Sequence, residues 1–234
     1  MQIFHHSILA MALSTILFVG GHFALSHPLR GPITRLAGAQ GFRAIYTLVA
    51  AVGLGWMIHA HATAPYVALW GDPIWARHLL LLIMIFAVAF AVIGFTTPSP
   101  SFVGAEKISM DYAHGLGIQA VTRHPGLWGF GLWAVGHMIA NGDLATVILT
   151  GGIALLAFGG MAGIDARKLR SFPEQYQPLV AHTSVLPFAA LIGGRAKLDW
   201  RKIGLWRIAA VPIVYLLLLY LHPYIIGLSA MPMP

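Results

Sequence analysis

Twelve histidines are the residues of this sequence with the widest range of chemistry. The chain of 234 residues has no cysteine, which excludes disulfides, thiolate metal sites, iron–sulfur clusters and c-type haem attachment. Imidazole nitrogen is therefore the ligand that we expect at any metal held by the protein. Six histidines lie in or beside long uncharged segments, namely His22, His59, His61, His78, His137 and His222.

The spacing of the histidines limits the metal sites that they could form. His59 and His61 are two residues apart and do not share a helix face, and the adjacent His5 and His6 have the same problem. A closed site therefore needs ligands from different helices. Two imidazoles facing each other across a planar macrocycle would suit haem b, which a single proximal histidine can also hold. Zinc is disfavoured because the uncharged segments offer no carboxylates. For any one histidine, a hydrogen bond between helices is the alternative interpretation.

The densest pattern lies between residues 122 and 145. It contains Thr122-Arg123-His124-Pro125, then Leu132-Trp133 with His137, then Asn141-Gly142-Asp143. Pro125 fits the first turn of a helix, and Asn141-Gly142-Asp143 predicts a tight turn into the next one. We interpret Arg123 as an anchor at lipid phosphate and the glycines as packing positions. This interpretation leaves His124 and His137, thirteen residues apart, without a role.

The scarcity of charge defines the elements that must position these residues. Charged residues make up 9% of the chain, against about 25% in a soluble domain. Six uncharged windows are each about long enough to cross a hydrocarbon core of ~30 Å. We therefore predict an all-α, polytopic transmembrane bundle that forms a single integral membrane domain over 1–234. The predicted spans are 3–25, 43–62, 77–97, 121–140, 144–164 and 205–226.

Lysine and arginine set the expected orientation of the bundle. The loops after spans one, three and five share a side and hold twelve of the fourteen basic residues, whereas the opposite loops hold only Arg77. The positive-inside rule places these basic loops in the cytoplasm and both termini in the periplasm of a bacterial inner membrane. The net charge of +7 then indicates orientation and contact with membrane lipids, and we expect no nucleic acid.

Two uncharged segments have alternative interpretations. No basic residue precedes the apolar run Ile8–Phe18, so we expect it to be a span, although a cleaved signal peptide is the alternative. The segment 175–194 contains Pro178 and Pro187, and we expect it to lie at the interface or to re-enter the membrane.

Several of these motifs carry a family resemblance. Arg123-His124-Pro125, Leu132-Trp133 with His137, and the stretch 140–145 resemble the NnrU family of bacterial membrane proteins. The later part of the chain, from Arg167 to Ala190 and again at Leu221-His222-Pro223, is similar to plant zeta-carotene isomerases. The first resemblance implies a link to denitrification and nitric oxide metabolism, without a settled activity. The second implies a haem b protein that converts a cis double bond to trans under redox control.

The resemblance also implies site residues and partners. It assigns the axial ligands of haem b to His22 and His137, with Arg123 and His124 as further cofactor-binding residues. It implies a lipophilic polyene as substrate and a redox partner. His22 and His137 lie toward opposite ends of their predicted spans, so a histidine such as His59 or His78 is an alternative partner for His137.

A second resemblance competes with the first. Arg-His-Pro before a basic stretch is similar to isoprenylcysteine and phospholipid methyltransferases, which implies S-adenosylmethionine bound with the help of His124. Asp165-Ala166 stands where that family has a pair of glutamates, and Leu127 replaces its tyrosine, so both positions disfavour methyl transfer. A non-catalytic factor for assembly of a denitrification or respiratory complex is the third hypothesis. The sequence leaves open whether the chain is an enzyme.

Overall fold

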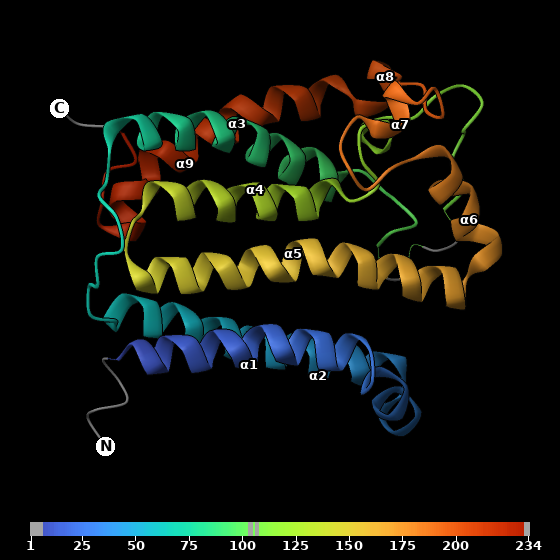
Figure 1. The fold of residues 1–234 in the computed structure, drawn as a ribbon. Helices are drawn as coiled ribbons and strands as arrows, with labels where there is room; N and C mark the ends of the chain where they lie inside the picture. Colours follow the sequence, from blue (N-terminus) through green and yellow to red (C-terminus); the bar gives the residue numbers. More distant parts are fainter. Residues whose placement is uncertain (1–6, 103–104, 106–107, 232–234) are drawn as a thin grey trace.

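The computed structural model describes residues 7–102, 105 and 108–231, and within them the chain is helical without a β-strand. Long helices lie side by side in a bundle, with shorter elements gathered at one end (Figure 1). The long helices are α1 (Ile8–Ser26), α2 (Arg30–Thr63), α3 (Ile74–Thr96), α4 (Pro125–Ala140), α5 (Leu144–Ser171) and α9 (Leu205–Ile226). The short elements are a 3-10 turn (Ile118–Ala120), α6 (Pro173–His182), α7 (Ala189–Ile192) and α8 (Trp200–Ile203). This architecture confirms the predicted all-α bundle.

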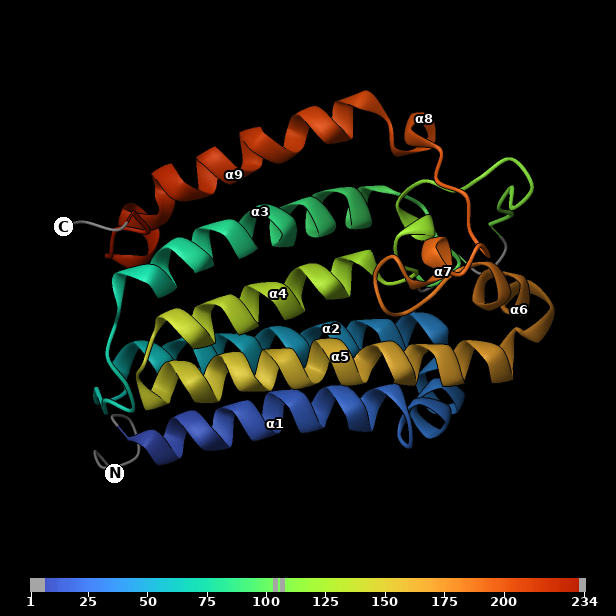
Figure 2. The same ribbon diagram turned by 45° about the horizontal axis from the view of Figure 1, so that its top comes forward.

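Five helices, α1, α2, α3, α5 and α9, are long and apolar enough to cross a membrane. The remaining predicted span, the fourth, corresponds to α4, which has 16 residues and a length of about 24 Å. It runs between α3 and α5 in the bundle (Figure 2). Span four was predicted to begin at residue 121, but the helix begins only at Pro125, which occupies its first turn. Proline favours that position because its missing N–H would be unsatisfied there anyway.

The second helix is longer than predicted. It begins at Arg30, whereas the predicted span begins at residue 43, so most of the expected first loop is helical. The two parts of α2 meet at Gly38, whose φ of +71° interrupts the regular helix. Glycine has no Cβ and reaches this region of φ at little cost, so the chain changes direction there.

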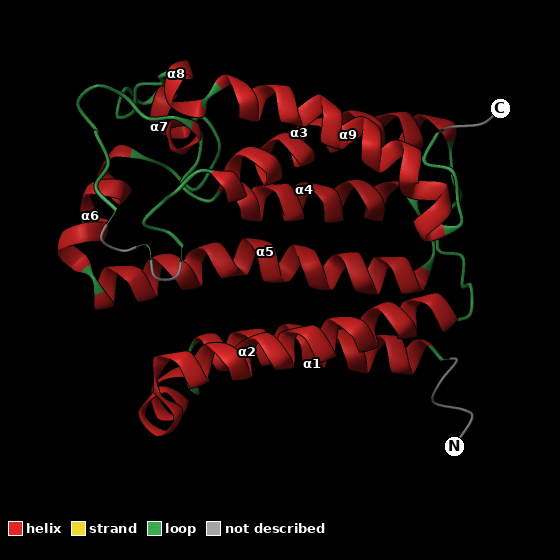
Figure 3. Ribbon diagram, turned by 180° about the vertical axis from the view of Figure 1, so that it is seen from behind, coloured by secondary structure: helices red, strands yellow, loops and turns green. Residues whose placement is uncertain are grey.

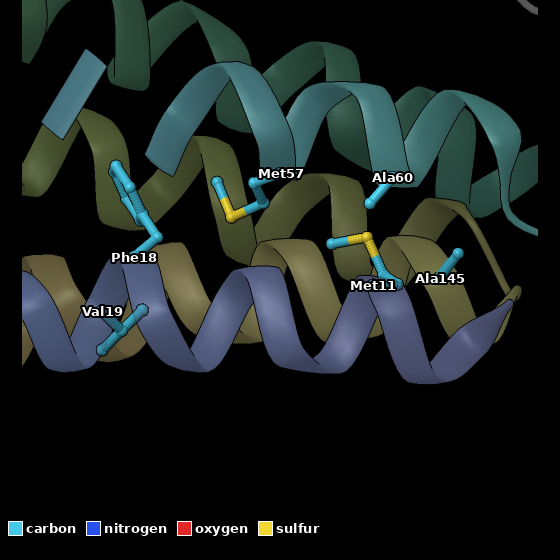
Figure 4. Close-up of a cluster of buried hydrophobic side chains, with 6 residues drawn as sticks. All are labelled: Met11, Phe18, Val19, Met57, Ala60 and Ala145. Carbon is cyan, nitrogen blue, oxygen red and sulfur yellow. The ribbon is translucent and has the colours of Figure 1, made fainter. Parts of the chain in front are cut away.

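The bundle is organised around α5. This helix packs against α1 on one side and α4 on the other, while α3 packs against α4 and α9 (Figures 1 and 2). A buried apolar cluster joins α1, α2 and α5 (Figure 4). Its members are Met11, Phe18, Val19, Met57, Ala60 and Ala145. The outermost helix, α9, has no buried residue, and its apolar side chains suit contact with lipid tails.

The two ends of the bundle differ in composition. The described turns and short helices of residues 97–102, 108–124 and 172–204 gather at one end, which we call the basic end (Figure 3). The first turns of α1 and α3 and the last turn of α9 lie at the other end (Figure 1). Arg77, in the first turn of α3, pairs with Asp72. Within the segment 175–194, α6 and α7 are too short to cross a membrane, in line with an interfacial position. His5, His6 and Lys107 lie outside the described residues, and the orientation across the membrane stays a prediction.

The predicted turn at Asn141-Gly142-Asp143 is present and joins α4 to α5. The Asp143 side chain accepts a hydrogen bond from the Thr146 N–H (3.0 Å) and so caps α5. The Gly142 carbonyl accepts hydrogen bonds from the N–H groups of Leu69 (2.7 Å) and Trp70 (3.2 Å). A Cβ atom on Gly142 would overlap the Trp70 carbonyl oxygen, so the close approach requires glycine.

We predict that Gly142→Ala lowers the free energy of unfolding by about 1–3 kcal/mol, because the added methyl group forces two backbone segments apart. Thermal unfolding of the purified protein in detergent measures the change. Gly160→Ala in α5 is the control, since its added Cβ meets no atom within 4 Å. Equal unfolding temperatures for Gly142→Ala and the unmodified protein would contradict the proposed contact.

Candidate functional site

A buried polar cluster at the basic end is centred on the carboxylate of Asp165 in α5. Oxygen Oδ2 accepts hydrogen bonds from Nε (2.9 Å) and Nη2 (2.6 Å) of Arg123. Oxygen Oδ1 accepts hydrogen bonds from Nε2 of His124 (2.7 Å) and from the hydroxyl of Tyr176 (2.7 Å). The Arg123 and Asp165 side chains are only 11% and 12% exposed. Both carboxylate oxygens are therefore fully used by neighbouring donors.

Three helices contribute to this cluster because of where each begins or ends. Arg123 and His124 immediately precede Pro125, which starts α4. Asp165 lies in the last two turns of α5, and Tyr176 lies in the first turns of α6. The bonds to Asp165 therefore fasten the start of α4, the end of α5 and the start of α6 to one point.

The chain before α7 folds over the start of α4 and encloses the cluster. The Arg123 N–H donates to the Ser184 carbonyl (3.0 Å). The Val185 carbonyl accepts from both the Thr122 hydroxyl (2.7 Å) and the Trp128 indole N–H (2.8 Å). These bonds satisfy backbone groups that would otherwise be buried without partners.

The charges inside the cluster compensate one another. A carboxylate removed from water is costly unless a cation and hydrogen bonds replace its hydration, and Arg123 with its two bonds supplies both. Burial, together with the hydrogen bond to Asp165, raises the pKa of the Tyr176 phenol. Tyr176 therefore stays neutral at physiological pH and keeps the proton that it donates to Asp165.

A cavity of about 170 Å³ lies beside the cluster. Its apolar wall includes Phe95, Phe102, Leu127 and Ile164, and His124 and Arg167 form part of its polar wall. An apolar cavity of about 150 Å³ holds one benzene molecule, so this space suits a single ring. S-adenosylmethionine, a nucleoside joined to an amino acid, is several times larger than one ring. The cavity therefore gives no support to the methyltransferase hypothesis.

The structure brings two of the four predicted site residues together. Arg123 and His124 meet at Asp165, which the sequence indicated only as a departure from the methyltransferase pattern. The interpretation of Arg123 as an anchor at lipid phosphate is wrong, because its guanidinium is buried in an ion pair. Tyr176 was missed, since no spacing linked it to the motif. An acidic residue directly after an uncharged window was the signal that could have identified Asp165.

The two predicted axial histidines each have the hydrogen bond that a haem ligand needs. The Nδ1 of His22 lies 2.7 Å from the Phe18 carbonyl, and the Nδ1 of His137 lies 2.8 Å from the Trp133 carbonyl. Because a carbonyl only accepts, each neutral ring carries its hydrogen on Nδ1 and leaves Nε2 free to bind a metal. The donor chemistry of each residue therefore fits haem.

The structure does not bring His22 and His137 together. The His22 ring contacts Phe18 of its own helix and Tyr46 of α2. The His137 ring instead contacts Trp133 and lies within electrostatic range of His222 in α9. The helices that carry them lie on opposite sides of α5 (Figure 1).

Contacts with α5 give the relative heights of the two histidines. In α5, Gly159 lies against Phe23 of α1, and the preceding residue, Phe158, lies against Gly131 of α4. His22, next to Phe23, is therefore at about the same height along the bundle as Gly131. His137 lies six residues further along α4, or about 9 Å. Among the described residues no group of three or more histidines and carboxylates could hold a metal ion. The His22–His137 pair stays a prediction, and each imidazole alone fits the role of a proximal ligand.

Comparison with known proteins extends over most of the chain. The family model described as "NnrU protein" matches residues 10–230. A chloroplastic 15-cis-zeta-carotene isomerase of Zea mays is 38% identical over 112 residues, which are 46% of this chain and 30% of that protein. The Arabidopsis thaliana protein of the same name is 35% identical over 82 residues, which are 34% and 22% of the two chains. The matched stretch thus spans less than a third of these curated relatives. No solved structure matches the chain.

We predict that Asp165→Asn lowers the free energy of unfolding by about 3–5 kcal/mol, because it leaves the Arg123 guanidinium buried without a counter-charge. Tyr176→Phe removes one hydrogen bond to a charged group and should cost about 1.5–3 kcal/mol. Chemical unfolding of the protein in micelles measures both changes. Asp111→Asn is the matched control, since this exposed carboxylate pairs with His114 and Lys202 at the surface and its loss should have little effect. Similar stabilities for Asp165→Asn and Asp111→Asn would contradict the central role of the cluster.

Proposed function

Because this chain belongs to the NnrU protein family, we propose that it is a membrane-embedded haem b protein that isomerises a cis double bond of a lipophilic polyene. The observation that carries the proposal is the similarity to 15-cis-zeta-carotene isomerases across nearly half of the chain. The five long apolar helices support it, because such a substrate dissolves in lipid and meets the protein inside the bilayer. We further propose the bacterial inner membrane as its location, with the basic end in the cytoplasm.

His22 and His137 are the residues that would hold the haem. When bound, haem supplies a redox-active iron for the electronic step of isomerisation. The Nδ1–H of each imidazole bonds a carbonyl of its own helix, which fixes the ring and directs Nε2 away from the backbone. Since the two rings face different neighbours, either histidine can serve as a proximal ligand in the described arrangement. A redox partner would set the oxidation state of the iron.

The rest of the bundle would position the substrate and exclude water. The side chains of α9 and the outer face of α3 are apolar and exposed, so a polyene can lie along them at no cost in desolvated polar groups. The Asp165 cluster fixes the ends of α4 and α5, and α4 carries His137. Residues of the cluster are therefore positioning residues in this proposal.

Haem binding has a direct spectroscopic test. Protein purified after expression with adequate haem should show a Soret band. The band should shift or weaken in His22→Ala, in His137→Ala or in both, because each variant removes an imidazole that would hold the haem. His114→Ala is the control, since this histidine is exposed and pairs with Asp111. A protein without a Soret band would overturn the haem proposal, and an unchanged spectrum in both variants would move the ligands elsewhere.

Isomerisation needs its own assay, because haem binding alone does not establish it. Protein in liposomes that contain 15-cis-zeta-carotene should raise the trans isomer above a protein-free control, as separated by chromatography. If a nitrogen of His137 holds the iron, the His137→Ala variant should isomerise the substrate at least about tenfold more slowly than the unmodified protein. A chain that binds haem but leaves the isomer ratio unchanged would contradict the isomerase. Stable co-purification of a respiratory complex would then favour the assembly hypothesis.

A further inference from the structure

One ring nitrogen of His124 has no role in the proposed isomerisation or in the cluster. Its Nε2 donates to Asp165, which as a carboxylate only accepts, so the neutral ring carries its hydrogen on Nε2. The Nδ1 atom is then a hydrogen-bond acceptor. It makes no hydrogen bond with any described residue, although His124 stands at the N-cap of α4 and its side chain is only 2% exposed. His124 lines a cavity, where this acceptor can take a hydrogen bond from a bound molecule.

The space in front of His124 is suited to a flat ring. His124 lines the cavity of about 170 Å³, whose volume slightly exceeds the roughly 150 Å³ that holds one benzene molecule. The rings of Phe95 and Phe102 both line the same cavity and are nearly parallel, with 14° between their planes. Aromatic walls of this kind favour an aromatic guest through stacked or edge-on contacts.

The ring-sized cavity borders the lipid-facing surface. Phe95, in the last turn of α3, lines the cavity and is also 52% exposed. Its ring lies 5.6 Å from that of Phe130 in α4, which is 49% exposed. A ligand can therefore place its ring beside His124 while an attached apolar chain runs past Phe130 into the lipid.

We propose that this cavity binds the head group of a membrane hydroquinone, a phenolic ring that carries a polyisoprenoid tail. One ring hydroxyl donates to Nδ1 of His124, and Asp165 fixes the imidazole from the other side. A polyene end lacks this donor. Apolar side chains form much of the wall and the Arg123 guanidinium is committed to Asp165, so a phosphate head group would meet only the Arg167 side chain as a cationic partner in this wall and is disfavoured. The inference goes beyond the proposed isomerisation and does not require haem.

Titration calorimetry with matched ligands tests the site in the unmodified protein. The probe is a decyl-tailed dimethylhydroquinone, added without oxygen to the full chain in nanodiscs of zwitterionic lipid. Its bis-methyl ether has the same ring and tail but no hydroxyl donor. The hydroquinone should bind at least about tenfold more tightly than the ether, which is the usual effect of one hydrogen bond. Equal affinity for the two ligands would overturn the proposal, as would the absence of binding.

Two substitutions locate the binding on the cavity. The amide N–H of His124→Gln can still reach Asp165, but the variant lacks Nδ1 and should weaken hydroquinone binding about tenfold, to the level of the ether. Leu127→Trp fills the cavity and should abolish the binding of both ligands. His114→Gln, at an exposed histidine of the basic end, is the control and should bind like the unmodified protein. Hydroquinone binding at full affinity in both cavity variants would contradict the assignment of binding to this cavity. If either variant fails to fold, the comparison of hydroquinone and ether in the unmodified protein still tests the proposal.

Hydroquinone binding and haem binding can be contradicted independently of each other. Hydroquinone binding in a protein without a Soret band would support this inference and overturn the haem proposal. A Soret band without discrimination between hydroquinone and ether would overturn this inference and leave the haem proposal standing.

Discussion

The carboxylate of Asp165 is the constraint on which the basic end of this protein depends. It lies at the end of an apolar helix, where an isolated charge would be expensive, and Arg123, His124 and Tyr176 replace its lost hydration. Because those three residues begin α4 and α6, one carboxylate sets the positions of two helix starts. Because Nε2 of His124 donates to this carboxylate, the other ring nitrogen, Nδ1, is left as a hydrogen-bond acceptor in a residue that lines the cavity.

The fold could be predicted largely from the placement of charge. Uncharged windows indicated the long helices because a membrane crossing excludes ionised side chains, and the turn at Gly142 followed from residue types that favour turns. The start of α2 could not be predicted, because the charged Arg30 and Arg35 indicated a loop where the structure has an exposed helical segment. The late start of α4 follows from Pro125, whose preference was recognised although the boundary was set four residues too early.

The candidate site was only half visible in the sequence. Arg123 and His124 were selected from a motif, but a motif does not show which distant residue its side chains contact. Asp165 is separated from them by about forty residues, and Tyr176 by about fifty, so only the packing of α4, α5 and α6 reveals the cluster. His22 and His137 were assigned by resemblance, and the structure shows their orientation within each helix while keeping the helices on opposite sides of α5.

These observations separate two regions of the molecule. His22 and His137, within the apolar bundle, each turn Nδ1 to a carbonyl of their own helix and leave Nε2 for a metal, while the basic end has a ring-sized cavity beside an oriented imidazole. A pyridine haemochrome determination on the purified chain tests the central claim, haem binding, most directly. The account predicts b-type haem in an equimolar ratio to protein, reduced in the His22→Ala variant, in the His137→Ala variant or in both. Only traces of haem after expression with adequate haem would contradict it.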